Sequence, residues 1–245
     1  MTVRPALVLV HGGRHGGWCW ARVAPILRAG GHDVYTPTLT GLGERAHLLA
    51  PEIGLETHVA DLVAVFLCED IDDAVLVGHS YGGCVIAGAM EEVAGRVRSV
   101  VFVDALVPRS GESMFDIVDP DIRRQLGELA AREGKGWYLP PSDASFYGVV
   151  DAADRAWVNS RTTAQPLKTY IDRFPVARRV WAHPGMFIQC TPSQLTDEML
   201  ERMRARSEVG PRFAYRVMDC PHDMMVTHPG RLADALLEEA RNERA

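Results

Sequence analysis

A serine stands between glycines at the end of an apolar run, in the segment VLVGHSYGGCVI at residues 75–86. Gly78, Ser80 and Gly82 fit the pattern G-x-S-x-G, in which a serine occupies a strained turn between a strand and a helix. The flanking sequence supplies both elements, and a side chain at either glycine would collide with one of them. We therefore predict that Ser80 is a nucleophile. The alternative is a tight turn with a capping serine.

A serine hydroxyl needs a base to take its proton before it can attack a carbonyl carbon. The chain has nine histidines, and His222 follows the last predicted strand and precedes the final helix, in MDCPHDMMVTHP. His228 stands next to Pro229 and is expected to cap that helix, whereas His11 and His79 flank glycines at strand ends and are expected to be structural. His222 is the predicted base.

Acyl transfer also needs two backbone N–H groups that stabilise the oxyanion. One is expected from Tyr81, the residue after the serine. The other is expected from Gly13, in the glycine-rich segment HGGRHGGW at residues 11–18. The alternative for this segment is a glycine-rich loop without a binding role.

Short apolar runs alternate along the chain with amphipathic stretches, which predicts a doubly wound parallel sheet with helices on both faces. Strands are expected at 6–11, 33–37, 73–79, 98–104, 185–190 and 213–219, and helices at 18–30, 55–69, 82–94, 195–206 and 229–242.

Residues 108–184 interrupt this alternation. They contain no clear sheet strand, but hold seven of the 15 prolines and nine of the 18 aromatic residues. We predict a helical cap subdomain at 108–184, inserted into a core formed by 1–107 and 185–245, rather than an irregular surface excursion. The aromatic residues expected to line an apolar pocket under the cap are Trp137, Tyr138, Phe146, Tyr147 and Trp157.

Composition excludes several functional classes. The net charge of −6 gives no basic surface for nucleic acid, and no apolar run approaches the ~20 residues of a membrane helix. The N-terminal residues lack the layout of a signal peptide, and the five scattered cysteines favour buried thiols over disulfides or a metal site. We therefore expect a cytoplasmic protein that binds neither nucleic acid nor membrane; its oligomeric state stays open, with a homodimer as one candidate.

Together the motifs LVLVHGGRHGGWCW, TLTGLGERAHLL, LVGHSYGG, VFVDALVP and PHDMMVTHP span nearly the whole chain. In this set and order the sequence resembles the α/β-hydrolase superfamily, nearest to the plant methylesterase and hydroxynitrile-lyase group and its bacterial esterase-like relatives. The resemblance implies a serine hydrolase without metal or cofactor, with Ser80 and His222 in catalytic roles and the amides of Gly13 and Tyr81 as the oxyanion hole.

The sequence departs from the plant enzymes at the triad acid. Those enzymes carry an aspartate shortly after the penultimate strand, where this chain has Ser193 in FIQCTPSQ. Asp104 ends the strand that follows the serine's helix, so it reaches the same sheet edge, and we predict that it completes the triad with a carboxylate oxygen ~2.6–3.2 Å from a ring nitrogen of His222. The alternative for Asp104 is a bond to loop amides. Asp197, Asp219 and Asp223 are weaker candidates for the acid.

These residues favour a hydrolase that cleaves a carboxylic ester of a small or medium apolar substrate through an acyl-enzyme. Two other interpretations stay open, a cyanohydrin lyase and a small-molecule receptor on the same scaffold. The lyases that the chain would resemble carry a threonine and a lysine where it has Gly12 and Asp223, which weighs against a lyase. An intact triad argues against binding alone.

Overall fold

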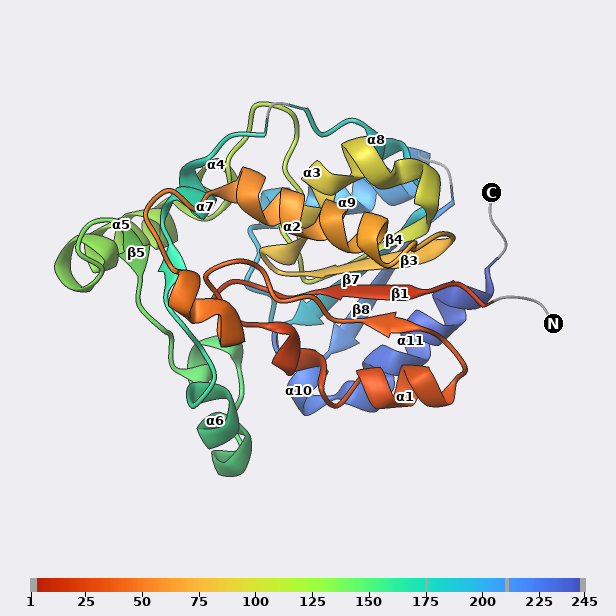
Figure 1. Ribbon diagram of the computed structural model, residues 1–245, viewed down its shortest axis with the longest axis horizontal. Helices are drawn as coiled ribbons and strands as arrows, with labels where there is room; N and C mark the ends of the chain where they lie inside the picture. Colours follow the sequence, from red (N-terminus) through yellow and green to blue (C-terminus); the bar gives the residue numbers. More distant parts are fainter. Residues whose placement is uncertain (1–3, 175, 210–211, 243–245) are drawn as a thin grey trace.

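The computed structural model describes residues 4–174, 176–209 and 212–242, and its central element is a six-stranded sheet (Figure 1). All neighbouring strands pair in parallel, in the order β2-β1-β3-β4-β7-β8. Their bounds are β1 Leu7–Val10, β2 Val34–Tyr35, β3 Ala74–His79, β4 Val97–Val103, β7 Gly185–Thr191 and β8 Phe213–Asp219. The six predicted strands are confirmed, and most are buried on both faces, as their near-continuous apolar sequences require.

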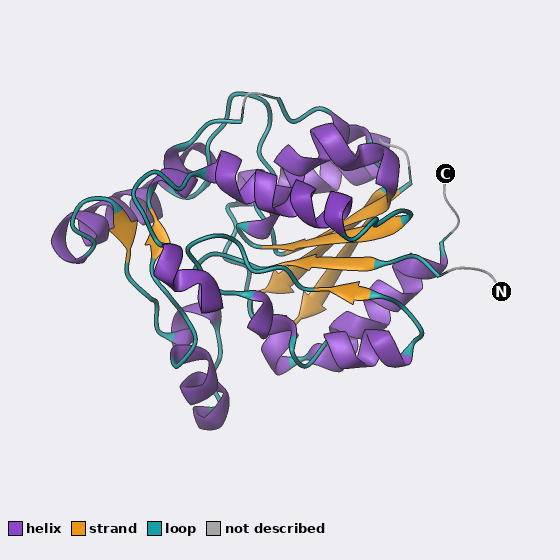
Figure 2. Ribbon diagram, viewed as in Figure 1, coloured by secondary structure: helices purple, strands orange, loops and turns teal. Residues whose placement is uncertain are grey.

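Alternate residues of each strand face two separate hydrophobic cores. On β3, Leu76 packs into one core and Val75 and Val77 into the other. Helices cover both faces, as Figure 2 shows. On one side lie α2 (Leu55–Cys68), α3 (Gly82–Val93), α8 (Arg179–Ala182) and α9 (Asp197–Val209); on the other lie α1 (Ala24–Ala29), α10 (Met224–Thr227) and α11 (Pro229–Arg241).

The helix predicted over 18–30 is wrong in its extent. The segment forms a 3₁₀-helix, η1 (Gly17–Trp20), a turn, and then α1, which starts at Ala24 with Pro25 in its first turn. Proline has no N–H to donate and a fixed φ, so it favours a new helix start over the continuation of an old one. Further 3₁₀-helices are η2 (Gly43–Leu48) and η3 (Ala94–Arg96).

Between β4 and β7, the residues that the structure describes form no strand of the main sheet. This part of the chain contains α4 (Met114–Ile117), α5 (Pro120–Glu133), β5 (Tyr138–Leu139), η4 (Ala144–Tyr147), α6 (Ala152–Asn159), β6 (Gln165–Pro166), α7 (Lys168–Ile171) and α8. The strands β5 and β6 pair antiparallel in a small sheet of their own. Figure 1 shows α5, β5 and α6 beyond the end of the main sheet, whereas α8 packs on α3. Over the ranges that the structure describes, no helix is long and apolar enough to cross a membrane.

Candidate active site

Ser80 occupies the turn between β3 and α3 with a left-handed backbone, at φ 50°. This conformation is uncommon for a residue with a side chain, and the flanking glycines make it possible. A Cβ on Gly78 would lie 2.8 Å from the carbonyl oxygen of Gly82, and one on Gly82 would lie 2.6 Å from that of Val10. Ser80 is partly exposed, while Tyr81 and Gly82 beside it are buried. The turn therefore presents the serine hydroxyl at the end of the sheet.

His222 and Asp104 form the hydrogen bond that the sequence predicts. The Nδ1 atom of His222 lies 2.6 Å from Oδ2 of Asp104, and both side chains are buried. Asp104 follows the last residue of β4 with φ 42°, and His222 lies in the loop between β8 and α10. The backbone carbonyl of His222 also accepts a hydrogen bond from Nε2 of His79 at 3.0 Å. His79 therefore positions the loop that carries the candidate base.

Asp104 also accepts hydrogen bonds from the end of β7 and from the segment after it. The hydroxyl of Ser193 donates to its Oδ1 at 2.6 Å, and the amide of Cys190 donates to the same oxygen at 3.3 Å. The three weaker candidates lie elsewhere: Asp223 pairs with His15, Asp197 begins α9, and Asp219 is exposed at the end of β8.

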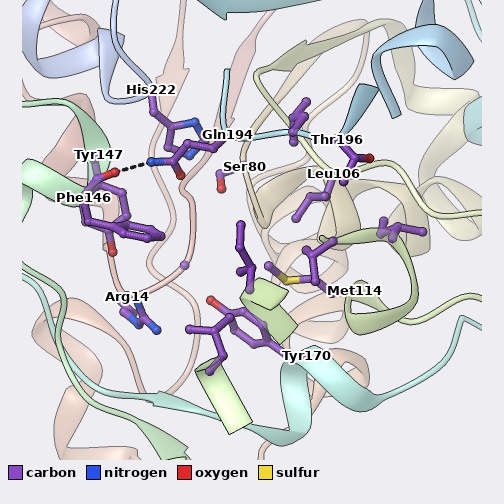
Figure 3. A pocket seen from close by; sticks show the side chains of 16 residues that line it. Arg14, Ser80, Leu106, Met114, Phe146, Tyr147, Tyr170, Gln194, Thr196 and His222 are labelled. Atoms are coloured by element: carbon purple, nitrogen blue, oxygen red, sulfur yellow. Dashed lines mark hydrogen bonds between the residues drawn. The ribbon is translucent and has the colours of Figure 1, made fainter. Parts of the chain in front are cut away.

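Ser80 and His222 line one cavity (Figure 3). The hydrogen bonds found among the described residues do not include one between these two side chains. Such bonds are often long in proteins without substrate and shorten when substrate binds. The structure thus brings Ser80, His222 and Asp104 to one edge of the sheet, with the His222–Asp104 pair already formed.

In the loop after β1, both polar groups of the peptide that joins Gly13 to Arg14 are hydrogen-bonded to side chains. The Nδ1 atom of His15 donates to the carbonyl of Gly13 at 2.7 Å, and the amide of Arg14 donates to Oε1 of Gln165 at 2.7 Å. The amides of Gly13 and Tyr81 have no partner among the hydrogen bonds of the described chain. Both N–H groups are therefore available to an acceptor.

His15 itself is held as a cation. Its Nε2 atom lies 3.0 Å from Oδ2 of Asp223, so both ring nitrogens face acceptors and both must carry a proton. Burial alone would lower the pKa of His15, but the Asp223 carboxylate and the Gly13 carbonyl raise it above its ordinary value. The side chain of His15 thereby fixes the orientation of the Gly13 peptide.

The cavity corrects part of the predicted aromatic lining. Phe146 and Tyr147 line it, but Trp137, Tyr138 and Trp157 do not. The rings of Trp137 and Tyr138 pack on each other, with centroids 4.9 Å apart. Trp157 packs edge-on against Trp18, away from the cavity. Aromatic content alone could not separate side chains that stabilise the inserted segment from those that face a ligand.

Most of the lining comes from residues that the sequence analysis did not single out. They include an arginine, a tyrosine, a glutamine and several aliphatic side chains: Arg14, Leu106, Met114, Ile117, Val118, Ile122, Leu126, Tyr170, Gln194, Leu195 and Thr196. The apolar spacing of 114–126 is a usable signal, because apolar side chains recur there every three or four residues, as along one face of a helix. Arg14, Tyr170 and Gln194 carry no such pattern.

His58 contacts the residue after Ser80, and its burial makes the free energy of unfolding depend on pH. It is buried, its Nε2 donates to the carbonyl of Thr40 at 2.9 Å, and its Nδ1 lies 2.8 Å from the hydroxyl of Tyr81. Burial lowers the pKa of His58 to about 4. In the unfolded chain the ring binds a proton below its ordinary pKa of ~6.5. Between pH 6.5 and pH 4 the unfolded state therefore binds more protons than the folded state.

We therefore expect the free energy of unfolding to decrease as the pH falls from 6.5 to 4, with His58 contributing about 3 kcal/mol of that decrease. Urea unfolding of the wild type and of His58→Gln at pH 7, 6, 5 and 4.5 measures it. The variant should be less stable at pH 7 and have a shallower slope, whereas His47→Gln, at an exposed position, is the matched control. Equal slopes in wild type and His58→Gln would contradict the assignment.

Comparison with known proteins agrees with this architecture. A family model described as "Alpha/beta hydrolase family" matches residues 7–235. A carbendazim hydrolyzing esterase from Nocardioides sp. (strain SG-4G) is 38% identical over 94% of this chain and 97% of its own length. Methylesterase 3 of Arabidopsis thaliana is 27% identical over 96% of this chain and 95% of its own. An extracellular alpha/beta-hydrolase from a Paenibacillus species has the same fold, with a TM-score of 0.83 at 21% identity, covering 97% of this chain and all of that one.

The chain belongs to the alpha/beta hydrolase family. Within that family its relatives include named esterases, and it is an enzyme of the carboxylesterase type.

Proposed function

We propose that this protein is a serine carboxylesterase that works through an acyl-enzyme, with Ser80, His222 and Asp104 as its catalytic triad. One observation carries the proposal: the strained turn presents Ser80 to the cavity that His222 also lines, and the far ring nitrogen of His222 lies 2.6 Å from a buried carboxylate. This is the arrangement that converts a serine hydroxyl into a nucleophile.

The reaction would proceed in two halves. Nε2 of His222 takes the proton of Ser80 as its Oγ attacks the ester carbonyl carbon, and the amides of Gly13 and Tyr81 hold the oxyanion. His222 then protonates the leaving alcohol. In the second half a water gives a proton to His222 and attacks the acyl-enzyme. The acid then leaves as His222 returns that proton to Oγ of Ser80. Asp104 keeps the proton on Nδ1 and stabilises the imidazolium.

The oxyanion hole has two further supports. The amide of Tyr81 lies at the start of the 12-residue helix α3, whose positive end favours negative charge. The peptide of Gly13 and Arg14 is held by His15 and Gln165. Since preorganised donors need no rearrangement as charge develops, both features favour stabilisation of the transition state.

The cavity favours a small or medium ester with a largely apolar body. Its volume is about 170 Å³ and it is partly open to solvent, and aliphatic side chains such as Leu106, Met114 and Leu195 supply much of its wall. Most of this wall comes from 108–184 and from the segment after β7. We propose that 108–184 is a cap that shapes the substrate pocket.

Labelling with a fluorophosphonate tests the proposal. The reagent should form one adduct, at Ser80, because only an activated serine attacks its phosphorus. Mass spectrometry of peptides locates the adduct, and p-nitrophenyl acetate hydrolysis should be lost as labelling proceeds. Ser80→Ala should take up no reagent, while Ser99→Ala, at a buried serine of β4, is the matched control. An adduct at another residue would contradict the assignment of Ser80 as the nucleophile, as would esterase activity that survives in purified Ser80→Ala.

A further inference from the structure

Arg14 is a buried cation in the wall of the candidate active site. It follows Gly13 in the loop after β1, adopts a left-handed backbone with φ 63°, and is only 3% exposed. Its side chain lines the same cavity as Ser80 and His222, and Figure 3 shows it with Tyr170 on the side away from His222. The reaction steps above use the backbone of this loop and give the guanidinium no role.

The guanidinium is incompletely satisfied within the protein. Nη1 donates to the hydroxyl of Ser142, but Nε and Nη2 are buried and have no hydrogen-bond partner in the described parts of the chain. No ion pair joins Arg14 to a carboxylate of those parts. The carboxylate of Asp223 pairs through Oδ2 with His15, the residue that follows Arg14. An arginine keeps its charge in proteins, and a buried charge without a counter-charge is strongly destabilising.

Two tyrosines extend this set of donors. The hydroxyl of Tyr147 is buried without a hydrogen-bond partner in the described chain, and that of Tyr170 would lie 2.6 Å from a Cβ placed on Gly13. Burial raises the pKa of Tyr147 and raises that of Tyr170 to about 12, so both hydroxyls keep their protons at neutral pH. The rest of the wall is mainly aliphatic and offers little to a second charged group.

We propose that Arg14, together with Tyr147 and Tyr170, forms a carboxylate-binding subsite, and that the preferred substrates are esters that also carry a free carboxylate. A carboxylate supplies the missing negative charge, and its lone pairs accept from the unpartnered donors of Arg14 and Tyr147, which are buried here, once these side chains turn toward it. A neutral acceptor such as a carbonyl would leave the buried charge uncompensated. The inference rests on the proposed esterase function for turnover, but the subsite itself binds an acid whether or not turnover occurs.

Paired substrates test the preference. Monomethyl adipate and methyl hexanoate differ by a carboxylate on the acyl side, and 4-acetoxybutanoate and butyl acetate by one on the alcohol side; a pH-stat follows all four. The wild type should favour the anionic member of at least one pair by about tenfold or more in kcat/KM, and Arg14→Gln should lower that ratio about 30-fold. Arg14→Lys should keep part of it, since it retains the charge but not the planar fork.

Binding provides a readout that does not depend on catalysis. Calorimetry should show hexanoate binding to the wild type at least tenfold more tightly than hexanamide, with that difference lost in Arg14→Gln and reduced in Tyr147→Phe, which removes one hydroxyl. Arg216→Gln is the matched control, because its guanidinium pairs with Glu238 on α11 and does not line the cavity.

The outcomes separate the two proposals. Neutral esters hydrolysed through Ser80, with no anionic preference and equal hexanoate binding in wild type and Arg14→Gln, would overturn the subsite alone. Absence of turnover and of a Ser80 adduct, with Arg14-dependent hexanoate binding, would overturn the esterase function and support the subsite. If Arg14→Gln does not fold, Arg14→Lys and Tyr147→Phe test the subsite instead. The same two ratios are measured: kcat/KM for the anionic over the neutral ester, and affinity for hexanoate over hexanamide.

Discussion

Replacing His222 with alanine is expected to lower kcat for ester hydrolysis by about 10⁵- to 10⁶-fold, the scale on which triad histidines act. The imidazole is the only group in the proposed mechanism that both accepts the serine proton and returns it to the leaving alcohol. Alanine removes both steps and also leaves Asp104 without its Nδ1–H donor. Steady-state hydrolysis of p-nitrophenyl acetate, corrected for the uncatalysed rate, measures the loss.

His228→Ala is the matched control for this experiment. His228 lies six residues further along the same segment, at the start of α11, and its ring contacts the hydroxyl of Thr227 at 2.9 Å. The ring makes no side-chain cap bond to α11, so the predicted capping role is not the contact observed. Its removal should change turnover by less than about threefold, an effect below ~1 kcal/mol. Near-normal rates in His222→Ala together with an inactive His228→Ala would reverse the two assignments.

Asp104→Asn is expected to lower kcat by about 10⁴-fold, because an amide favours the wrong tautomer of the histidine. The carboxylate accepts from His222, Ser193 and two backbone amides, so its replacement also changes the pattern of donors and acceptors. Circular dichroism should still show a folded protein. Asp219→Asn, at an exposed position at the end of β8, is the control and should keep the wild-type rate. An unchanged rate in Asp104→Asn would refute the role of Asp104.

A second variant separates loss of the acid from local distortion. The hydroxyl of Ser193 lies 2.6 Å from the Asp104 carboxylate, so aspartate at 193 would place a carboxylate beside the amide that replaces it. The double variant Asp104→Asn with Ser193→Asp is therefore expected to recover at least about tenfold of the lost kcat. Recovery of kcat would show that His222 requires a carboxylate, and that this carboxylate can come from position 193 as well as from position 104.

The fold could be predicted from sequence wherever the information is local. Parallel strands buried on both faces give continuous apolar runs, and the turn at Ser80 tolerates only glycine at Gly78 and Gly82, so the strands and the turn are evident in the residues themselves. The prediction for 18–30 failed because the apolar pattern of that segment continues through a turn, after which the proline starts a new helix.

The candidate site was predictable only in part, because its catalytic residues follow from strand ends whereas its pocket wall depends on contacts between distant segments. Ser80, His222 and Asp104 stand at the ends of predicted strands, and parallel strands bring such positions to one edge. The pocket wall depends on how 108–184 folds over that edge. The apolar spacing of 114–126 indicates one buried face there, but it does not specify what that face covers. Arg14 was missed because an arginine in a glycine-rich loop resembles a solvated side chain until Tyr147 and Ser142 enclose it.

The contact between Ser193 and Asp104 also bears on how such a triad can change during evolution. In the plant enzymes that the chain resembles, the acid is expected at the position of Ser193, whereas the acid proposed for this chain, Asp104, directly follows the neighbouring strand β4. An ancestor with aspartate at both positions would hold two carboxylates in direct contact, and like charges so close share one proton, which leaves a single anion to face the histidine. Each substitution along that route keeps one ionised acid beside His222. On the proposed triad, the acid would therefore pass between adjacent strands while a carboxylate stays beside His222 at each step.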